Sequence, residues 1–279
     1  MKKKIGIVSL LLVLALVLVL LPGLFTEAEA AAASSITVNG YDLPSGYYLP
    51  TATWTKTTTK PSGSYFYYSS GTLTMYNVTL SSPSGTRAVY AEGDLVVNLS
   101  GTNKLTTDAN GIRSTGTLKF TGSGSLTVNS SGYNAIYSSG NMEFAQTGTV
   151  TATATGATSS GVETAGKLTI GGNLNATAES SYAIFASGDI SMTKGTVNAT
   201  GNCTYSAGGI RSNGAITISG GTLNVTSKSD GIISKYDFWQ KAGNVTVNAD
   251  WNGIAVETAT NNAIIHEGVM TVTAVRDGL

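Results

Sequence analysis

Apolar and small residues recur at a nearly constant interval over most of this chain. Eight segments align, AVYAEGDL, GIRSTGTL, AIYSSGNM, GVETAGKL, AIFASGDI, GIRSNGAI, GIISKYDF and GIAVETAT, and they begin at Ala88, Gly111, Ala135, Gly161, Ala183, Gly209, Gly231 and Gly253. Successive segments start 22 to 26 residues apart. A sustained period in this range is typical of a solenoid in which each repeat forms one coil.

The columns of this alignment have separate structural meanings. The first column is always Ala or Gly, which indicates close packing. The second column is β-branched in every repeat, which predicts an inward strand position; its members are Val89, Ile112, Ile136, Val162, Ile184, Ile210, Ile232 and Ile254. The sixth column is Gly in the first six repeats, from Gly93 to Gly214. A Gly at this position predicts a turn with positive φ or a close backbone approach.

Two further strands follow in each repeat, and both alternate between apolar and polar positions. The second strand carries inward pairs such as Leu118/Phe120 and Met142/Phe144, and the third carries pairs such as Leu126/Val128. Three strands per repeat predict an all-β, single-stranded parallel β-helix with coils of about 23 residues and eight to nine coils. An antiparallel sandwich is the alternative, but two-residue hairpin turns are not regularly placed.

The two ends of the repeat region differ from its middle. Residues 31–70 hold a dense group of aromatic residues and three of the five prolines, and they predict an N-terminal cap or linker. The predicted β-helix occupies residues 71–279 and has no proline after Pro83, as strands with fully paired N–H groups require. Near the C-terminus, either the irregular segment 258–267 or another chain is expected to cover the last coil.

Residues 1–30 resemble an export signal. Lys2, Lys3 and Lys4 precede an apolar run from Ile5 to Phe25, and Ala28-Glu29-Ala30 fits a cleavage site. An uncleaved membrane anchor is the alternative, since the run is long enough to span a bilayer. Either case predicts that the remaining chain is secreted, extracellular or at the cell surface.

Composition and charge exclude some classes of partner. Without residues 1–30 the chain has 13 basic and 14 acidic residues, a net charge of −1. This balance gives no reason to expect nucleic acid or an anionic membrane as a partner. Cys203 is the single cysteine and His266 the single histidine, so an internal disulfide and a paired-histidine metal site are both excluded.

A row of outward positions provides the candidate binding site. Two residues after each small anchor the chain carries, in order, Tyr90, Arg113, Tyr137, Glu163, Phe185 and Arg211, followed by Ile233 and Ala255. Aromatic rings can stack on the C–H faces of sugars, and planar charged groups can hydrogen-bond their hydroxyls. The row therefore suits an extended glycan, and a mixed solvated face is an equally good interpretation.

The third strands predict a second outward surface, made of Thr and Asn. Stacked Thr and Asn side chains hydrogen-bond along a parallel ladder, so a structural role is the first interpretation. A polysaccharide-binding or ice-binding surface is the alternative. Catalysis is not expected, because the acidic residues are scattered rather than paired or clustered.

Several repeat motifs resemble a known family. The segments AVYAEGDLVVNLSGTNKL, GSLTVNSSGYNAIYS, AIYSSGNMEF and SDGIISKYDF are similar to secreted bacterial carbohydrate-binding domain-containing proteins, over a stretch from about Gly71 to the end. The resemblance implies a right-handed parallel β-helix with a pectate-lyase-like fold that binds carbohydrate without cleaving it. It also implies calcium sites at the residue before the anchor, where Asp230 is the one acidic residue; no other cofactor is expected.

These observations predict a non-catalytic, secreted β-solenoid that binds an extracellular polysaccharide or cell-wall glycan. A cell-surface structural or adhesive solenoid without a small ligand is the main alternative. A polysaccharide lyase or an ice-binding protein is a lesser one.

Overall fold

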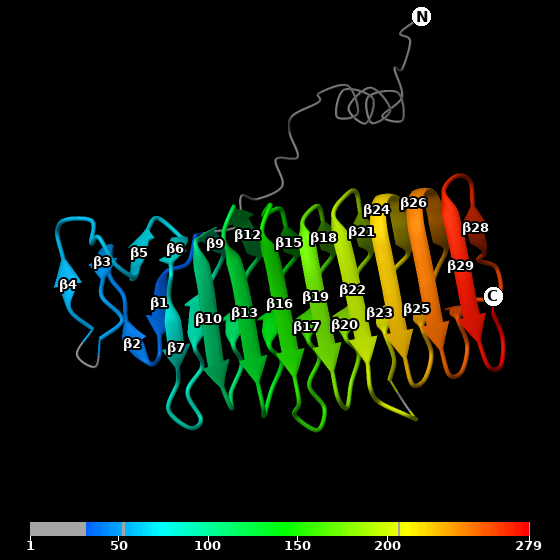
Figure 1. Ribbon diagram of the computed structural model, residues 1–279, viewed down its shortest axis with the longest axis horizontal. Coiled ribbons are helices and arrows are strands. Elements are labelled where there is room, and N and C mark those ends of the chain that lie inside the picture. Colours follow the sequence, from blue (N-terminus) through cyan, green and yellow to red (C-terminus); the bar gives the residue numbers. More distant parts are fainter. Residues whose placement is uncertain (1–31, 52–53, 206, 279) are drawn as a thin grey trace, which may run out of the picture. The chain divides into compact units, whose positions relative to one another are not determined.

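Each sequence repeat forms one coil of a parallel β-solenoid of about 8 turns (Figure 1). The computed structural model describes residues 32–51, 54–205 and 207–278, so the predicted export signal lies outside the described residues. Every coil contributes one strand to each of three faces, and equivalent strands of successive coils pair in parallel. The prediction of an all-β parallel solenoid is therefore confirmed. The described part of the chain contains no helix able to cross a membrane.

Face 1 is formed by the strands that follow the Ala or Gly anchors. Its coil strands pair in the order β8 (Val89–Glu92), β11 (Ile112–Ser114), β14 (Ile136–Ser138), β17 (Val162–Thr164), β20 (Ile184–Ala186), β23 (Ile210–Ser212), β25 (Ile232–Ser234) and β27 (Ile254–Val256). At the N-terminal edge, β1 (Ser35–Val38) pairs antiparallel with β8, and β2 (Tyr41–Asp42) pairs antiparallel with β1.

Faces 2 and 3 join into one continuous sheet because two long strands turn the corner between them. Face 2 contains β6 (Thr72–Tyr76), β9 (Leu95–Ser100), β12 (Leu118–Gly122), β15 (Met142–Phe144), β18 (Leu168–Ile170), β21 (Ile190–Met192) and β28 (Ala263–Ile265). Face 3 contains β7 (Thr79–Ser81), β10 (Thr102–Thr107), β13 (Ser125–Ser130), β16 (Thr149–Ala154), β19 (Asn173–Ala178), β22 (Thr196–Gly201) and β29 (Val269–Ala274). The corner strands are β24 (Ile216–Ser227) and β26 (Phe238–Ala249), and each pairs on both faces.

Antiparallel strands precede the first coil. β3 (Gly46–Tyr48) pairs with β4 (Lys56–Thr57) and with β5 (Tyr65–Ser69), and β5 pairs antiparallel with β6. These strands, with β1 and β2, occupy the N-terminal edges of faces 1 and 2. At the other end, residues 258–267 include β28, which continues face 2 rather than closing the solenoid.

The core is a stack of inward side chains along the solenoid axis. All eight β-branched residues of the second alignment column are buried, as are the inward pairs of the second strands. Phe120 and Phe144 are fully buried and their rings stack with centroids 4.9 Å apart. In the third strands the predicted inward pairs are also buried, except that Met270 and Val272 of the last strand are partly exposed.

Close backbone approach explains most of the Gly column. Of its members, Gly93 alone has a positive φ, 105°. A Cβ atom on Gly140 would lie 2.8 Å from the carbonyl carbon of Gly116 in the preceding coil. Buried hydroxyl groups also stabilise the turn between face 1 and face 2. Ser138 Oγ donates to the Gly116 carbonyl at 2.7 Å, and Ser114 Oγ donates to the Gly93 carbonyl at 2.6 Å. These tight corners hold the strands of face 1 in constant register.

Candidate functional site

The predicted binding residues form one continuous row on face 1. The strand register pairs Tyr90 with Arg113, Arg113 with Tyr137, Tyr137 with Glu163, Glu163 with Phe185, and Phe185 with Arg211. All six side chains are partly exposed, whereas their neighbours in each strand are buried. Coil spacing along such a ladder is about 4.8 Å, so the three aromatic rings recur about every 10 Å. The alternation of inward and outward positions therefore gives the row that the sequence predicts.

Two Arg–Tyr pairs form the N-terminal half of this row. The Arg113 guanidinium lies over the ring of Tyr137, 5.2 Å from its centroid, and that of Arg87 lies over Tyr90 at 4.8 Å. Arg87 and Tyr90 also line a hollow of about 190 Å³ with Thr37 and the turn at Gly85 and Thr86. Cation–π contacts of this kind hold both groups in place while leaving guanidinium N–H groups free to donate.

An aspartate from the next coil positions the turn that carries Arg87. The Asp108 carboxylate accepts a hydrogen bond from Ser84 Oγ at 2.5 Å and one from the Gly85 amide at 2.7 Å. The hydrogen bond from Ser84, followed by that from Gly85, lowers the pKa of Asp108 below its usual value. The carboxylate thus stays charged and keeps both bonds over the ordinary pH range.

The middle of the row is supported by side chains from the corner before face 1. Asn134 Nδ2 donates to Glu163 Oε2 at 3.0 Å, which fixes the carboxylate in the row. Tyr182 stacks on Phe185 with ring centroids 6.0 Å apart. The Phe185 site therefore offers two neighbouring rings rather than one.

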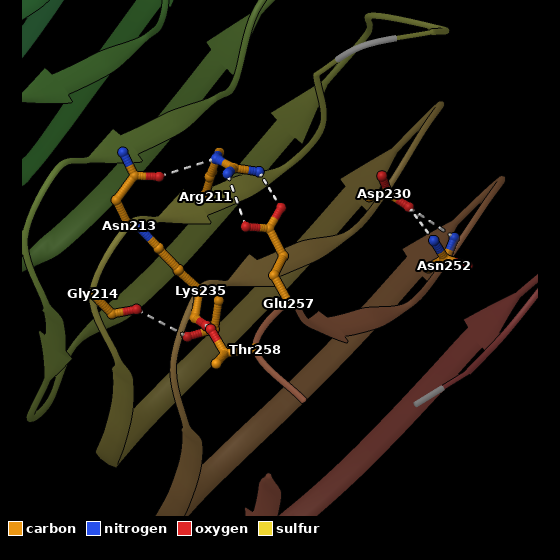
Figure 2. Close-up of polar contacts among 9 residues, drawn as sticks. Arg211, Asn213, Gly214, Asp230, Lys235, Asn252, Glu257 and Thr258 are labelled. Atoms are coloured by element: carbon orange, nitrogen blue, oxygen red, sulfur yellow. Dashed lines mark hydrogen bonds and ion pairs between the residues drawn. The ribbon is translucent and has the colours of Figure 1, made fainter. Parts of the chain in front are cut away.

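The C-terminal half of the row is closed by an ion pair. Figure 2 shows Arg211 between Asn213 and Glu257: its two terminal nitrogens contact the Glu257 carboxylate at 2.7 and 3.0 Å, and its Nε donates to Asn213 Oδ1 at 3.3 Å. Burial has the largest single effect and disfavours the charged form of Arg211. The hydrogen bond to Glu257, the charge of Glu257 and the interactions with Tyr182 together outweigh it, so the pKa of the guanidinium is raised. Arg211 is therefore the most fully engaged cation of the row.

The row ends sooner than the sequence indicates. The prediction that Ile233 continues it outward is wrong, because Ile233 is only 7% exposed. Arg211 and Glu257 belong to coils on either side of Ile233, so the ion pair spans it. The candidate site therefore runs from Tyr90 to Arg211.

The sequence alone missed the partners of these residues. Arg87, Asn134 and Tyr182 all occupy the column just before the small anchor, where the family resemblance implied calcium ligands. Their constant position in the alignment, directly before the anchor and three residues before the row, could have indicated that they lie beside it. In the same column, Asp230 Oδ1 accepts hydrogen bonds from the Asn252 amide at 3.2 Å and its Nδ2 at 2.7 Å (Figure 2). Across the part of the chain that the structure describes, no group of three or more His, Cys, Asp or Glu residues is arranged to hold a metal ion.

The Thr and Asn surface lies on face 3 and is bonded within itself. Asn198 Nδ2 donates to Asn175 Oδ1 at 2.8 Å, and Asn224 Nδ2 donates to Asn198 Oδ1 at 2.9 Å. This amide ladder follows the in-register pairing of β19, β22 and β24. Such stacking stabilises the sheet, which favours the structural interpretation of this face.

The C-terminal part of the chain matches a known protein family. No curated protein and no solved structure matches the chain significantly. Residues 159–279 match the model of a family described as carbohydrate-binding domain-containing protein. This segment includes Glu163, Phe185 and Arg211, and the strand register continues their row to Tyr90 without a break. The matching segment 159–279 is therefore similar to the carbohydrate-binding domain-containing family that the repeat motifs resemble.

Proposed function

We propose that this protein is a secreted, non-catalytic solenoid that binds an extended extracellular polysaccharide or cell-wall glycan along face 1. The observation that carries the proposal is the in-register row of three rings and three planar charged groups from Tyr90 to Arg211. A glycan chain lying along the solenoid axis contacts several rings at once, and each further contact adds to the affinity as an intramolecular event. Tyr90, Tyr137 and Phe185 stack on sugar faces, and Arg113, Glu163 and Arg211 bond hydroxyl groups.

Binding without cleavage is supported by the hydrogen bonds and ion pairs of the acidic groups in and beside the row. Acid–base hydrolysis of a glycosidic bond requires two carboxylates on opposite sides of that bond. Glu163 is held by Asn134, and Glu257 is held by Arg211 at the C-terminal end. Export rests on Lys2–Lys4, the apolar run and the Ala28-Glu29-Ala30 site. A calcium requirement through Asp230 is tested by the glycan-array experiment.

A glycan-array screen of the chain from Ala31, with and without calcium, tests this function. We expect selective binding to particular glycans, and we expect Tyr137→Ala to weaken it about tenfold, which corresponds to about 1.4 kcal/mol. Tyr236→Ala is the matched control, because Tyr236 is 46% exposed but lies in the turn after face 1, outside the row. A blank array with folded protein, or equal losses in both variants, would contradict the proposal and favour a structural or adhesive solenoid.

A second variant separates face 1 from face 3. Thr151 lies in the middle of the Thr and Asn surface and pairs in register with Asn175. A lysine at this position places a long charged side chain on an otherwise flat surface. Unchanged glycan binding by Thr151→Lys is the expected result, and loss of binding would move the site to face 3.

A further inference from the structure

The last coil of the solenoid has a free strand edge on faces 2 and 3 (Figure 1). Among the strands that the structure describes, β28 and β29 each pair on one side alone, with β26 of the preceding coil. Residues 258–267, one of the two covers expected from the sequence, continue face 2 as β28 and leave this edge open. A free edge exposes N–H and C=O groups with which another strand can pair. Another chain is therefore the expected cover that is left.

Exposed aliphatic side chains gather at this edge. In the described part of the chain, the large aliphatic residues that are exposed are Ile265, Val269 and Val275, at 44%, 61% and 79%, and all three belong to the last coil. Met270 and Val272 are partly exposed, whereas the equivalent inward residues of the preceding coil are buried. The end thus presents part of the core beside an unpaired edge, a combination that favours association through strand pairing.

We infer that two copies of this chain associate through their C-terminal edges about a two-fold axis, with β29 of one copy antiparallel to β29 of the other. Antiparallel strands already extend the same two sheets at the N-terminal end, where β1 pairs with β8 and β5 with β6. Because those strands cover the N-terminal edges of faces 1 and 2, a head-to-tail stack of copies is blocked there. A two-fold contact uses the open edge of both copies and forms a closed dimer.

The pattern of side chains favours one register for this pairing. With Thr271 opposite Thr271 of the second copy, Met270 lies opposite Val272, so that inward apolar residues cover one another. The same register brings Glu267 of one copy to the position next to Arg276 of the other. Both side chains are exposed, and in the described ranges neither has an ion-pair partner in its own copy. The edge is thus self-complementary in apolar surface and in charge.

Sedimentation equilibrium of the chain from Ala31 at increasing protein concentration tests the inference. We expect a monomer–dimer equilibrium without larger species. Thr271→Lys is expected to raise the dimer dissociation constant at least tenfold, because the two-fold axis sets two like charges opposite each other. Thr151→Lys is the matched control, since Thr151 is an outward residue of face 3 in an interior coil, and it should dimerise as the wild type does. A monomer at every concentration, larger species, or an equally stable dimer in T271K would overturn the inference.

A cysteine placed on the axis tests the register. Directly opposed residues of antiparallel strands have Cα atoms about 4.5–5.5 Å apart, which a disulfide can span. In a Cys203→Ser background, Thr271→Cys is expected to form a covalent dimer on mild oxidation. Thr246→Cys, at the register partner of Thr271 one coil inward, should stay uncrosslinked, because its two copies lie three strand spacings apart, roughly 14 Å. Crosslinking of T246C alone, or of neither variant, would overturn the arrangement. Neither readout involves a glycan, so the proposed function is tested separately.

Discussion

Truncation of the core ring in Phe144→Ala is expected to destabilise the solenoid by about 3–5 kcal/mol. Phe144 is fully buried, stacks on Phe120 in the preceding coil with an interplanar angle of 3°, and pairs in register with Ile170 in the next. Its loss leaves a cavity between consecutive coils. Because a solenoid is stabilised by contacts between neighbouring coils, the damage affects both interfaces of this coil. Urea denaturation followed by circular dichroism measures the change.

Glu143→Ala is the matched control for that experiment, since Glu143 is the adjacent outward residue of the same strand. It forms an exposed ion pair with Lys119 at 2.8 Å, and such pairs contribute about 1 kcal/mol or less. A loss of less than about 1 kcal/mol in Phe144→Ala would show that the Phe120–Phe144 stack does not form a packed core.

A methyl group added at Gly140 is expected to cost about 2–3 kcal/mol, although the residue lies in a turn. Its Cβ atom would lie 2.8 Å from the carbonyl carbon of Gly116 and 2.9 Å from the amide nitrogen of Thr117. Both atoms belong to the backbone of the preceding coil, so a rotamer change cannot relieve the clash. The coils must separate at this corner. The free energy of unfolding of Gly140→Ala, from the same urea titration, measures the effect.

Gly63→Ala provides the control, because nothing lies within 4 Å of a Cβ atom at that position. Its stability is expected to stay within about 0.5 kcal/mol of the wild type. If Gly140→Ala were equally harmless, the corners would not be held by close backbone approach, and the Gly column would need another explanation.

The repeat unit could be predicted because each coil repeats the same local pattern. The β-branched column from Val89 to Ile254 is buried throughout, and the outward column from Tyr90 to Arg211 is in register. In a strand, adjacent side chains point to opposite faces, so once the inward column is known the outward row follows. Parallel pairing of identical coils then places equivalent residues next to one another.

Contacts that join different columns could not be predicted from the same pattern. Glu257 lies 46 residues after Arg211, two coils further along, and its ion pair with Arg211 joins the coils on either side of the buried Ile233. Likewise, the pattern gave no indication that Asn134 and Tyr182, in the column before the anchor, contact Glu163 and Phe185 of the outward row. Such contacts depend on side-chain length and direction across a corner, and residue spacing does not encode them.

The ends were also only partly predictable, because they do not repeat. The dense aromatic group before residue 70 gave no indication that β1 pairs antiparallel with β8 or that β5 pairs antiparallel with β6. At the other end, the last repeat has Thr258 in the column where the first six repeats have Gly, and this irregularity suggested a cap. Instead, Thr258 Oγ1 donates to the Lys235 carbonyl at 2.6 Å, and β28 then continues the coil.

Calorimetric titration of oligosaccharides of increasing length tests most directly the claim that face 1 is a linear glycan site. The glycan selected by the array is titrated as short and long chains into the wild type and into the triple variant Y90A/Y137A/F185A. The row predicts that affinity of the wild type increases with chain length until the glycan spans Tyr90 to Phe185, and that the triple variant loses this dependence while staying folded. Affinity that is independent of chain length, or a triple variant that binds as the wild type does, would contradict the account.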